Sequence, residues 1–321
     1  MYRRDWLKTV EDFFREKNRA WLTADENTLL HFLAGTPADC HSFLEVRALR
    51  EAVRRREDVR YRKAKTNLQI TSTAWHPEGE LALVDAVETV RFYYEQGDRI
   101  EHETRRNRHR LTLMPFGDTW RVIRDESPYE KASWQEREAV PELPDLSAEE
   151  EADLRVLQET RGRYNRVAAY KYAELWWDGF NPAYKRMPDN DCTNFVSQVL
   201  HAGGIPMVPS SSRSKGWWYR NANNGWSYSW TVAHSLRNAL SRYMNAQALS
   251  DPRQLKVGDI ICYDWDGDNR WQHNTVVVGF DYYGYPLVNA HTVASHRRYW
   301  TYQDSYAFTS RTQYELYQIP D

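Results

Sequence analysis

Hydrophobic positions in the first part of the chain recur at helical spacing. Between residues 2 and 22 the apolar side chains come every three or four positions with charged residues between them, namely Trp6, Val10, Phe13, Phe14 and Trp21. This pattern predicts an amphipathic helix. Thr23 and Glu26 have the spacing of a capping box, which predicts a second helix that ends at Gly35. A third, basic helix is expected over residues 42–57.

From about residue 60 the period of the pattern changes to two. Polar and apolar residues alternate at 68–72, and residues 81–94 are rich in β-branched and aromatic types. Two further segments, at 111–114 and 119–123, complete four strands joined by turns. Helices followed by such a meander predict an α+β domain over residues 1–126 with an antiparallel sheet. This order of elements resembles the cone-shaped domain of nuclear transport factor 2-like proteins.

The composition changes between residues 127 and 155, where three prolines and an excess of acidic residues replace the periodic pattern. We interpret this segment as a linker. A helix is expected over residues 147–178, and residues 156–321 are expected to form a second domain. Its strands are connected by short turns, which predicts a central antiparallel sheet. They are expected at 257–263, 273–280 and 285–292.

The segment around Cys192 carries the candidate chemistry. Apolar residues at 195, 196, 199 and 200 have helical spacing, and Gly203-Gly204 ends the helix. Cys192 therefore lies at a helix N-terminus, where the dipole and the unpaired N–H groups favour a thiolate. We expect a lowered pKa and a nucleophilic Cys192, the alternative being a small buried cysteine. Asp191 either caps this helix or orients the nucleophile loop, and capping is favoured.

A cysteine hydrolase also needs a base within hydrogen-bonding reach of the thiol. His273 opens a predicted strand, and the next strand brings residues 289–293 back beside it. Asn289 and His291 are two residues apart, so we expect them on one face of that strand. Either side chain could hydrogen-bond to the His273 ring and hold its tautomer. A cysteine on a helix, followed by a histidine and a polar residue on adjacent strands, is the papain-like order.

Several motifs of the second half occur in a definite order along residues 160–318. They are Tyr164-Asn-Arg166, Asp191-Cys-Thr-Asn-Phe-Val-Ser-Gln198, Gly203-Gly-Ile-Pro-Met207, Gly258-Asp259, Tyr263-Asp-Trp-Asp-Gly-Asp268, His273 and Val288-Asn-Ala-His-Thr292. Together they resemble the putative amidase domain family, which is related to NlpC-type and CHAP cell-wall amidases and endopeptidases.

The resemblance implies a papain-like cysteine hydrolase domain with Cys192 as the nucleophile and His273 as the base. It implies His291 as the third polar residue, with Asn289 as the rival position. The family pattern usually has Asp before the base histidine, where this chain has Gln272. That departure could weaken the positioning of His273 or tune its pKa.

Other chemistry-bearing residues admit two interpretations. Trp217 and Trp218 either form the wall of a substrate groove or belong to an aromatic core under a long loop. Residues 264–268 alternate carboxylates as a calcium loop does, but Gly and Glu are missing at positions 6 and 12 of the calcium pattern, so a hairpin loop is favoured. Cys262 is expected in the core and Cys40 has no visible partner. No metal or cofactor is expected.

Charge and composition narrow the class of protein. The net charge of −2 excludes a globally basic nucleic-acid binder, and three cysteines exclude a disulfide scaffold. Basic runs at 53–65 and 105–110 could bind an anionic partner such as a wall polymer or nucleic acid, but a solvated helix face and an exposed strand edge protected by charge are favoured. No export signal or membrane span is recognisable, which predicts a cytoplasmic protein, with cell-wall association left open by the resemblance.

The leading hypothesis is a thiol-dependent hydrolase of amide or peptide bonds, with a peptide or a peptidoglycan-like polymer as substrate. Two alternatives stay open. One is a catalytically inactive binding or scaffold module for a wall fragment or a protein partner. The other is an acyl transferase that uses an amine acceptor instead of water.

Overall fold

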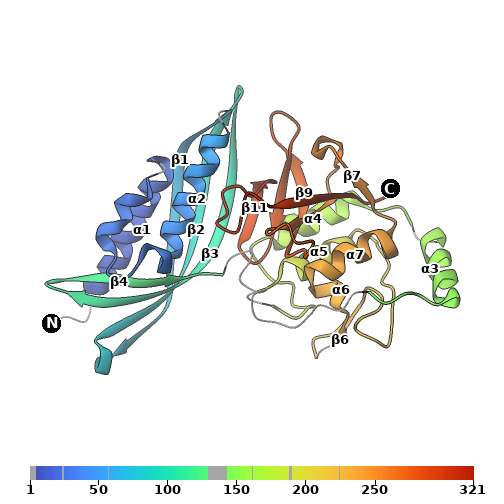
Figure 1. The fold of residues 1–321 in the computed structure, drawn as a ribbon, viewed down its shortest axis with the longest axis horizontal. Helices are drawn as coiled ribbons and strands as arrows, with labels where there is room; N and C mark the ends of the chain where they lie inside the picture. Colours follow the sequence, from blue (N-terminus) through green and yellow to red (C-terminus); the bar gives the residue numbers. More distant parts are fainter. Residues whose placement is uncertain are drawn as a thin grey trace. The chain divides into compact units, whose positions relative to one another are not determined.

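The structure is a computed structural model that describes residues 5–23, 25–56, 58–128, 143–160, 162–187, 190–223 and 225–321. The chain divides into two compact units, Met1–Tyr129 with Thr301–Phe308, and Glu130–Trp300 with Thr309–Asp321. Each unit combines helices with antiparallel strands, as expected for an α+β protein (Figure 1). Residues 301–308 group with the first unit, although the sequence pattern places them in the second domain.

Two long helices of the first unit form as expected. They are α1 (Asp5–Thr23) and α2 (His41–Arg55), which contact each other (Figure 1). The apolar stripe of α1 is buried as its spacing predicts. Between the two helices the chain forms short 3-10 turns at Glu26–Phe32 and Pro37–Asp39.

The predicted capping box at residue 23 is wrong. Asp25 caps the first 3-10 turn instead, because its side chain accepts a hydrogen bond from the Asn27 N–H at 3.1 Å. The Thr23 hydroxyl donates back to the Arg19 carbonyl of α1. The second helix is therefore a short 3-10 segment that ends before Gly35, where a Cβ would meet the Ile123 carbonyl oxygen at 2.1 Å.

The predicted four-strand meander is confirmed, with longer strands than the sequence suggested. The strands are β1 (Val59–His76), β2 (Leu81–Gln96), β3 (Arg99–Phe116) and β4 (Thr119–Glu126), each antiparallel to the next. Every second residue of β2 is buried against the helices of the unit, which is the expected two-residue period.

The interpretation of the basic run 105–110 as an exposed strand edge is wrong. The run lies in β3, where residues 105–110 all pair with β2 and Arg110 also pairs with Glu126 of β4. Alternate residues of the run face inward, where Asn107 and His109 are buried. The run at 53–65 ends α2 and begins β1, the outer strand of this meander, in keeping with its interpretation.

Buried charges join the helices of the first unit to its sheet. The Lys17 ammonium donates to Glu45 at 2.8 Å and to Glu88 at 2.7 Å, and its side chain is fully buried. His109 lies 2.7 Å from Asp125. Burial alone would lower the pKa of His109, but the Asp125 carboxylate outweighs it and raises the pKa to about 9.

The second unit has five helices among its described residues. They are α3 (Ala148–Thr160), α4 (Arg166–Trp176), α5 (Cys192–Ala202), α6 (Tyr228–Thr231) and α7 (Ala233–Met244). The single helix expected over 147–178 is wrong, because α4 starts anew at Asn165. The Asn165 side chain accepts a hydrogen bond from the Ala168 N–H at 3.0 Å, which is an N-cap.

The sheet of this unit has the strand order β11-β10-β9-β8-β12-β7, and every neighbouring pair is antiparallel. The strands are β7 (Gln247–Leu249), β8 (Ile260–Asp264), β9 (His273–Phe280), β10 (Pro286–Ala290), β11 (Ala294–Tyr299) and β12 (Gln313–Gln318). A separate hairpin joins β5 (Tyr219–Asn221) to β6 (Gly225–Trp226). Asn289 pairs with Val276, so the predicted register of β10 beside the start of β9 is confirmed.

The core of the second unit lies between α5, α7 and the sheet. Phe195, Val199, Val276 and Cys262 belong to one cluster of buried residues, which confirms the core placement of Cys262. As expected, α5 ends before Gly203. A Cβ on Gly203 would lie 2.2 Å from a ring carbon of Tyr164, so this glycine is required for the close packing of the helix end.

No helix in the described ranges is both long enough and apolar enough to cross a membrane.

Candidate active site

Cys192 is the first residue of α5 and is 1% exposed. Its thiol lies 3.7 Å from the Thr193 hydroxyl. It also accepts a hydrogen bond from the backbone N–H of Asn274, near the start of β9. The Asn274 side chain in turn donates to the Thr193 hydroxyl at 3.1 Å. These contacts fix the N-terminus of α5 against the beginning of β9.

The lowered pKa expected for Cys192 is wrong. Burial has the largest effect and raises the pKa of this thiol, and the charge of Asp191 acts in the same direction. Hydrogen bonds from the Asn274 N–H and from the hydroxyls of Thr193 and Thr292 lower the pKa without offsetting burial. The resting side chain is therefore a neutral thiol.

Asp191 orients the loop before Cys192 and does not cap the helix. It occupies the N-cap position, but its side chain makes no capping bond. One carboxylate oxygen instead accepts the Met187 N–H at 3.1 Å and the Asn194 side-chain amide at 2.9 Å. The favoured capping interpretation is wrong, and the structure agrees with the alternative that the sequence left open.

His291 binds the other oxygen of Asp191 at 2.5 Å through Nδ1. Its Nε2 lies 2.7 Å from the Trp176 carbonyl oxygen, so Nε2 must carry a proton. The ring also stacks on Phe195, with 4.1 Å between ring centroids. Both nitrogens of His291 are thus engaged away from the thiol.

Thr292 follows His291 and has an unusual backbone conformation. Its φ of 78° lies in the left-handed region, which a β-branched residue seldom adopts. Its hydroxyl is buried and has no well-aligned hydrogen-bond partner among the described residues. The same hydroxyl is close enough to the Cys192 thiol to lower its pKa. Strained residues of this kind gather at functional sites, and the sequence pattern offered no signal for this one.

His273 is fully buried at the start of β9. Its ring centroid lies 5.5 Å from that of Tyr263 and 5.9 Å from that of Trp265. Because side chains alternate along a strand, His273 points to the face opposite the Asn274 side chain, which meets α5. The contact between the start of β9 and the thiol is made by the backbone N–H of Asn274, the residue after His273.

Asn289 and His291 share a face of the sheet as predicted, since both contact α4. The Asn289 side-chain amide donates to the Ala173 carbonyl at 3.2 Å and to Glu174 at 3.0 Å, and its oxygen accepts the Arg297 N–H. These bonds tie α4 to β10. The hydrogen bond expected from Asn289 or His291 to the His273 ring is replaced by these contacts.

The two tryptophans proposed for a substrate groove are in the core. Trp217 is completely buried and its indole N–H donates to Ser197 of α5, while Trp218 is 4% exposed. A buried indole cannot line an open groove, so the aromatic-core alternative describes them. Trp230, which the sequence did not single out, donates to the Asn194 side chain at 3.0 Å and so supports the nucleophile loop.

The segment after β8 is a hairpin turn, as favoured over a calcium loop. The Asp264 carboxylate accepts backbone N–H groups from Asp266, Gly267 and Asn269, which folds the turn around it.

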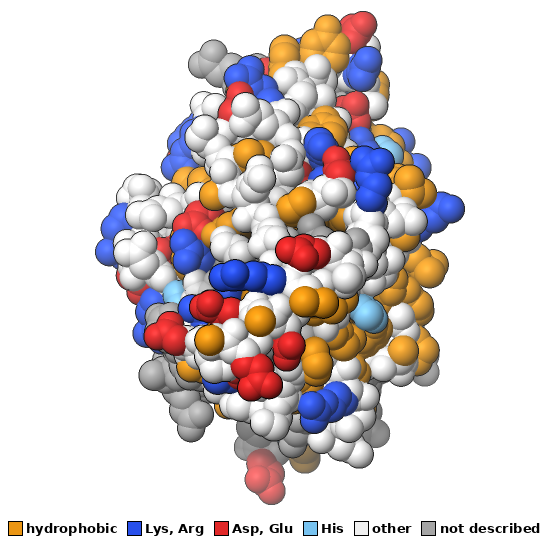
Figure 2. Space-filling view, turned by 90° about the vertical axis from the view of Figure 1, so that its right-hand side faces the viewer, with side chains coloured by type: hydrophobic (Ala, Val, Ile, Leu, Met, Phe, Trp, Pro, Cys, Tyr) orange, Lys and Arg blue, Asp and Glu red, His pale blue; other side chains and the backbone are white. Residues whose placement is uncertain are grey.

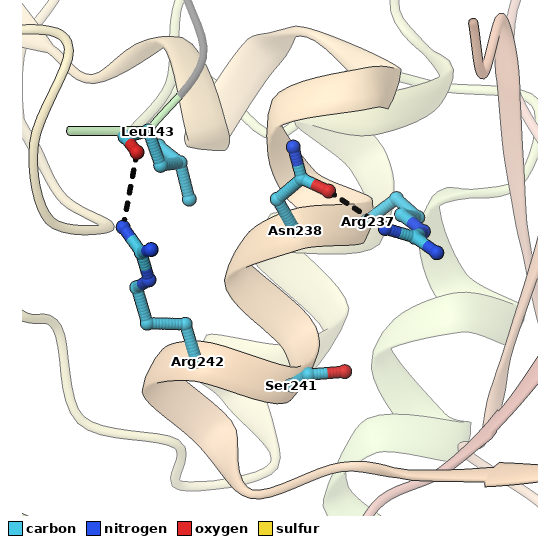
Figure 3. Close-up of a pocket in the computed structure, with 5 residues that line it drawn as sticks. All are labelled: Leu143, Arg237, Asn238, Ser241 and Arg242. Atoms are coloured by element: carbon cyan, nitrogen blue, oxygen red, sulfur yellow. Dashed lines mark hydrogen bonds between the residues drawn. The ribbon is translucent and has the colours of Figure 1, made fainter. Parts of the chain in front are cut away.

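Two other places could hold a ligand. In the first unit Glu45, Glu88 and His109 bring ligand atoms within 4.8 Å of one another, but the Lys17 ammonium already bonds both carboxylates. A surface pocket on α7 is lined by Leu143, Arg237, Asn238, Ser241 and Arg242 (Figure 3). Its two arginines are engaged, Arg237 with Glu315 and Arg242 with the Leu143 carbonyl.

On one face of the molecule, basic and acidic side chains alternate over the surface (Figure 2).

The region around this site is similar to a known protein family. Residues 163–317 match the family model of the putative amidase domain. The resemblance stated from the sequence motifs is thereby confirmed for the C-terminal half. The matched region contains α4, α5 and all strands from β5 to β11, with Cys192 and His273 inside it.

Two proteins of Bacillus subtilis strain 168 are similar to this chain. Uncharacterized protein YhbB is 44% identical over 193 residues, which cover 59% of this chain and 60% of the relative. Uncharacterized protein YjcM is 31% identical over 124 residues, which cover 36% of this chain and 27% of the relative. Among solved structures, the intermembrane space region of the chloroplast protein ARC6 aligns with 37% of this chain and 94% of its own, at 13% identity and a TM-score of 0.27.

Proposed function

We propose that the chain is a thiol-dependent hydrolase of amide or peptide bonds with a papain-like site, in which Cys192 is the nucleophile and His273 the base. The place of the thiol carries the proposal. Cys192 begins α5 and is hydrogen-bonded to the amide of the residue that follows His273, inside a region that matches an amidase family. A peptide or a peptidoglycan-like polymer is the proposed substrate class.

The proposed reaction has two steps. His273 takes the proton of the Cys192 thiol, and the thiolate attacks the amide carbonyl carbon. The C–N bond breaks, the amine leaves with the proton from His273, and a thioester remains on Cys192. His273 then takes a proton from water, the hydroxide attacks the thioester, and the acid leaves as the thiol is restored. The N–H groups of the first turn of α5 are suited to bind the oxyanion.

The resting geometry places three demands on this reaction. The His273 ring has to turn toward the thiol from the face opposite the Asn274 side chain. The residues that cover Cys192 have to move for a carbonyl carbon to reach the sulfur. Proton transfer to His273 has to accompany substrate binding, because a neutral thiol is a weak nucleophile. In this scheme Asp191 and His291 are positioning residues, since they hold the loop and the start of α5.

Replacement of the two reacting groups tests the proposal. We expect Cys192→Ala to abolish release of amine from a panel of peptides and peptidoglycan fragments, and His273→Ala to lower kcat about 100-fold or more. Cys262→Ala, which removes the other buried thiol of the unit, is the matched control and should keep activity. Activity that survives Cys192→Ala would refute the thiol mechanism.

One observation favours the alternative of a non-catalytic binding module. His291 is hydrogen-bonded to Asp191 and to Trp176 of α4, Asn289 is hydrogen-bonded to α4 and to Arg297, and Cys192 is buried. For a binding module, wild type and Cys192→Ala would bind the same peptide equally and neither would release product. Product coupled to an added amine would instead identify acyl transfer.

A further inference from the structure

Charge is unevenly distributed around the candidate site. Residues 179–250 contain seven Lys and Arg, two Asp and no Glu, although the whole chain has a net charge of −2. One of the two carboxylates, Asp191, is buried and bonded to His291. The segment that carries the nucleophile therefore has a surplus of positive charge.

Lys185 and Arg186 lie in the segment before Cys192, and Arg213 lies over the same Trp226 ring as Lys185. We call these three cations the basic rim. The backbone of Lys185 is fixed on both sides. Its carbonyl accepts the Asn194 side-chain amide of α5 at 3.1 Å, and its N–H donates to the Tyr219 hydroxyl at 2.8 Å. The rim is thus attached to the same helix end that holds the thiol.

Aromatic rings hold the rim side chains in place. The Arg186 guanidinium lies 4.3 Å from the ring centroid of Phe180, which packs against His291 at 5.4 Å between centroids. The Lys185 ammonium and the Arg213 guanidinium lie 5.2 and 5.4 Å from the ring centroid of Trp226. The Arg186 guanidinium keeps its N–H edge for a carboxylate, whereas Arg213 already donates from Nε to the Trp226 carbonyl at 3.0 Å.

The rim cations have no acidic partner among the described residues, whereas Lys215, Arg237 and Arg242 of the same segment do. Lys215 pairs with Glu150 at 3.1 Å, and Arg237 pairs with Glu315 at 2.5 Å. Lys185 and Arg186 are also exposed. Cations that lack an acidic partner and lie in or beside the segment that leads into Cys192 are suited to bind an anionic ligand.

We propose that the basic rim binds the carboxylates of an acidic peptide whose amide bond is presented to Cys192. This inference rests on the proposed hydrolase function and names its substrate class. A peptide fits better than a nucleic acid for two reasons. Three cations are few beside the six to ten phosphate contacts of a typical nucleic-acid binder, about half or fewer. Because the rim is attached to the helix end that holds the thiol, one ligand can place its carboxylate at the rim and its scissile amide at Cys192.

Paired peptides test this substrate class. Each Glu- or Asp-containing peptide is compared with the same sequence carrying Gln or Asn, which differs in charge but hardly in shape. Binding is measured by calorimetry to the Cys192→Ala protein, and hydrolysis is measured with the intact thiol. We expect about tenfold tighter binding of the acidic member, and a smaller difference at 0.5 M than at 0.05 M salt.

The rim variant Lys185→Gln/Arg186→Gln should remove this discrimination. Its KM for the acidic peptide should rise about tenfold with little change in kcat, and its KM for the neutral peptide should stay the same. The matched control, Arg253→Gln/Lys256→Gln, removes two exposed cations that pair with Asp251 and Asp321. This control should retain the preference for the acidic peptide.

Three results would overturn the proposal. They are equal binding of both peptides by the wild-type rim, equal effects of the rim and control variants, and equally effective competition by an oligonucleotide of the same charge. Discriminating binding without hydrolysis would support the rim and refute the hydrolase. Hydrolysis with no preference for the acidic peptide would support the hydrolase and refute the rim. The two proposals can therefore be refuted separately.

Discussion

Lys17 offers a direct test of how the first unit is held together. Its ammonium is fully buried and lies 2.8 Å from Glu45 and 2.7 Å from Glu88. In Lys17→Met the side chain keeps its length but loses its charge, so two carboxylates stay buried without their cation. Breaking a buried ion pair in this way costs about 3–5 kcal/mol of unfolding free energy. For a unit of this size that loss lowers the midpoint of thermal unfolding by roughly 10 °C or more.

The assay has to isolate the first unit, because a two-unit chain need not unfold in one step. Hydrogen exchange read by mass spectrometry on peptides from α1 and β2 reports the opening free energy of this unit within the full chain. Lys8→Met, the same substitution at an exposed position of α1, is the control and should change little. Adding Glu88→Gln to Lys17→Met should recover part of the loss, since one buried negative charge is removed.

The effect of Lys17→Met also has a definite pH dependence. Burial has the largest single effect and raises the pKa of Glu45, but Lys17, His41 and His109 together outweigh it and hold the pKa well below its ordinary value. Without Lys17 the carboxyl becomes easier to protonate, so the penalty should shrink as the pH falls from 7 to 5. A loss below about 1 kcal/mol, or one equal to that of Lys8→Met, would refute the view that this ion pair is essential.

Three further predictions follow from single contacts. The pKa of His109 is raised to about 9, so its contribution to the free energy of unfolding is complete below pH 6.5 and is lost as the pH rises to 9. The loss amounts to about 3 kcal/mol. Guanidinium unfolding of His109→Gln should lack this pH dependence. Alkylation of Cys192 should titrate above the ordinary thiol value of about 8.5, and Thr292→Val but not Thr292→Ser should raise that pKa further. Gly203→Ala should cost about 2 kcal/mol by overlap with Tyr164, measured against Gly162→Ala, where a Cβ meets nothing within 4 Å.

Much of the fold follows from local patterns in the sequence. The apolar stripe of α1, the alternation in β2 and the hairpins of the second unit were predictable because burial imposes periods of 3.6 and 2. The break between α3 and α4 was missed because Asn165 caps a new helix inside a continuous helical pattern. The buried β3 run was missed because its charges are neutralised by partners distant in sequence, such as Asp125 for His109.

The candidate site shows the same limit at the level of chemistry. The sequence placed Cys192 correctly at a helix N-terminus, and from that position alone a thiolate followed. The helix end contributes only about 0.3–1 kcal/mol to a nearby charge at an exposed site, up to about 2 kcal/mol when partly buried. Removing an unpaired anion from water costs several kcal/mol, so burial decides the pKa and the thiol is neutral at rest. A nucleophile at this position therefore has to be activated during substrate binding, and how deeply the helix end is buried is fixed by β9 and β10, which no local pattern around Cys192 encodes.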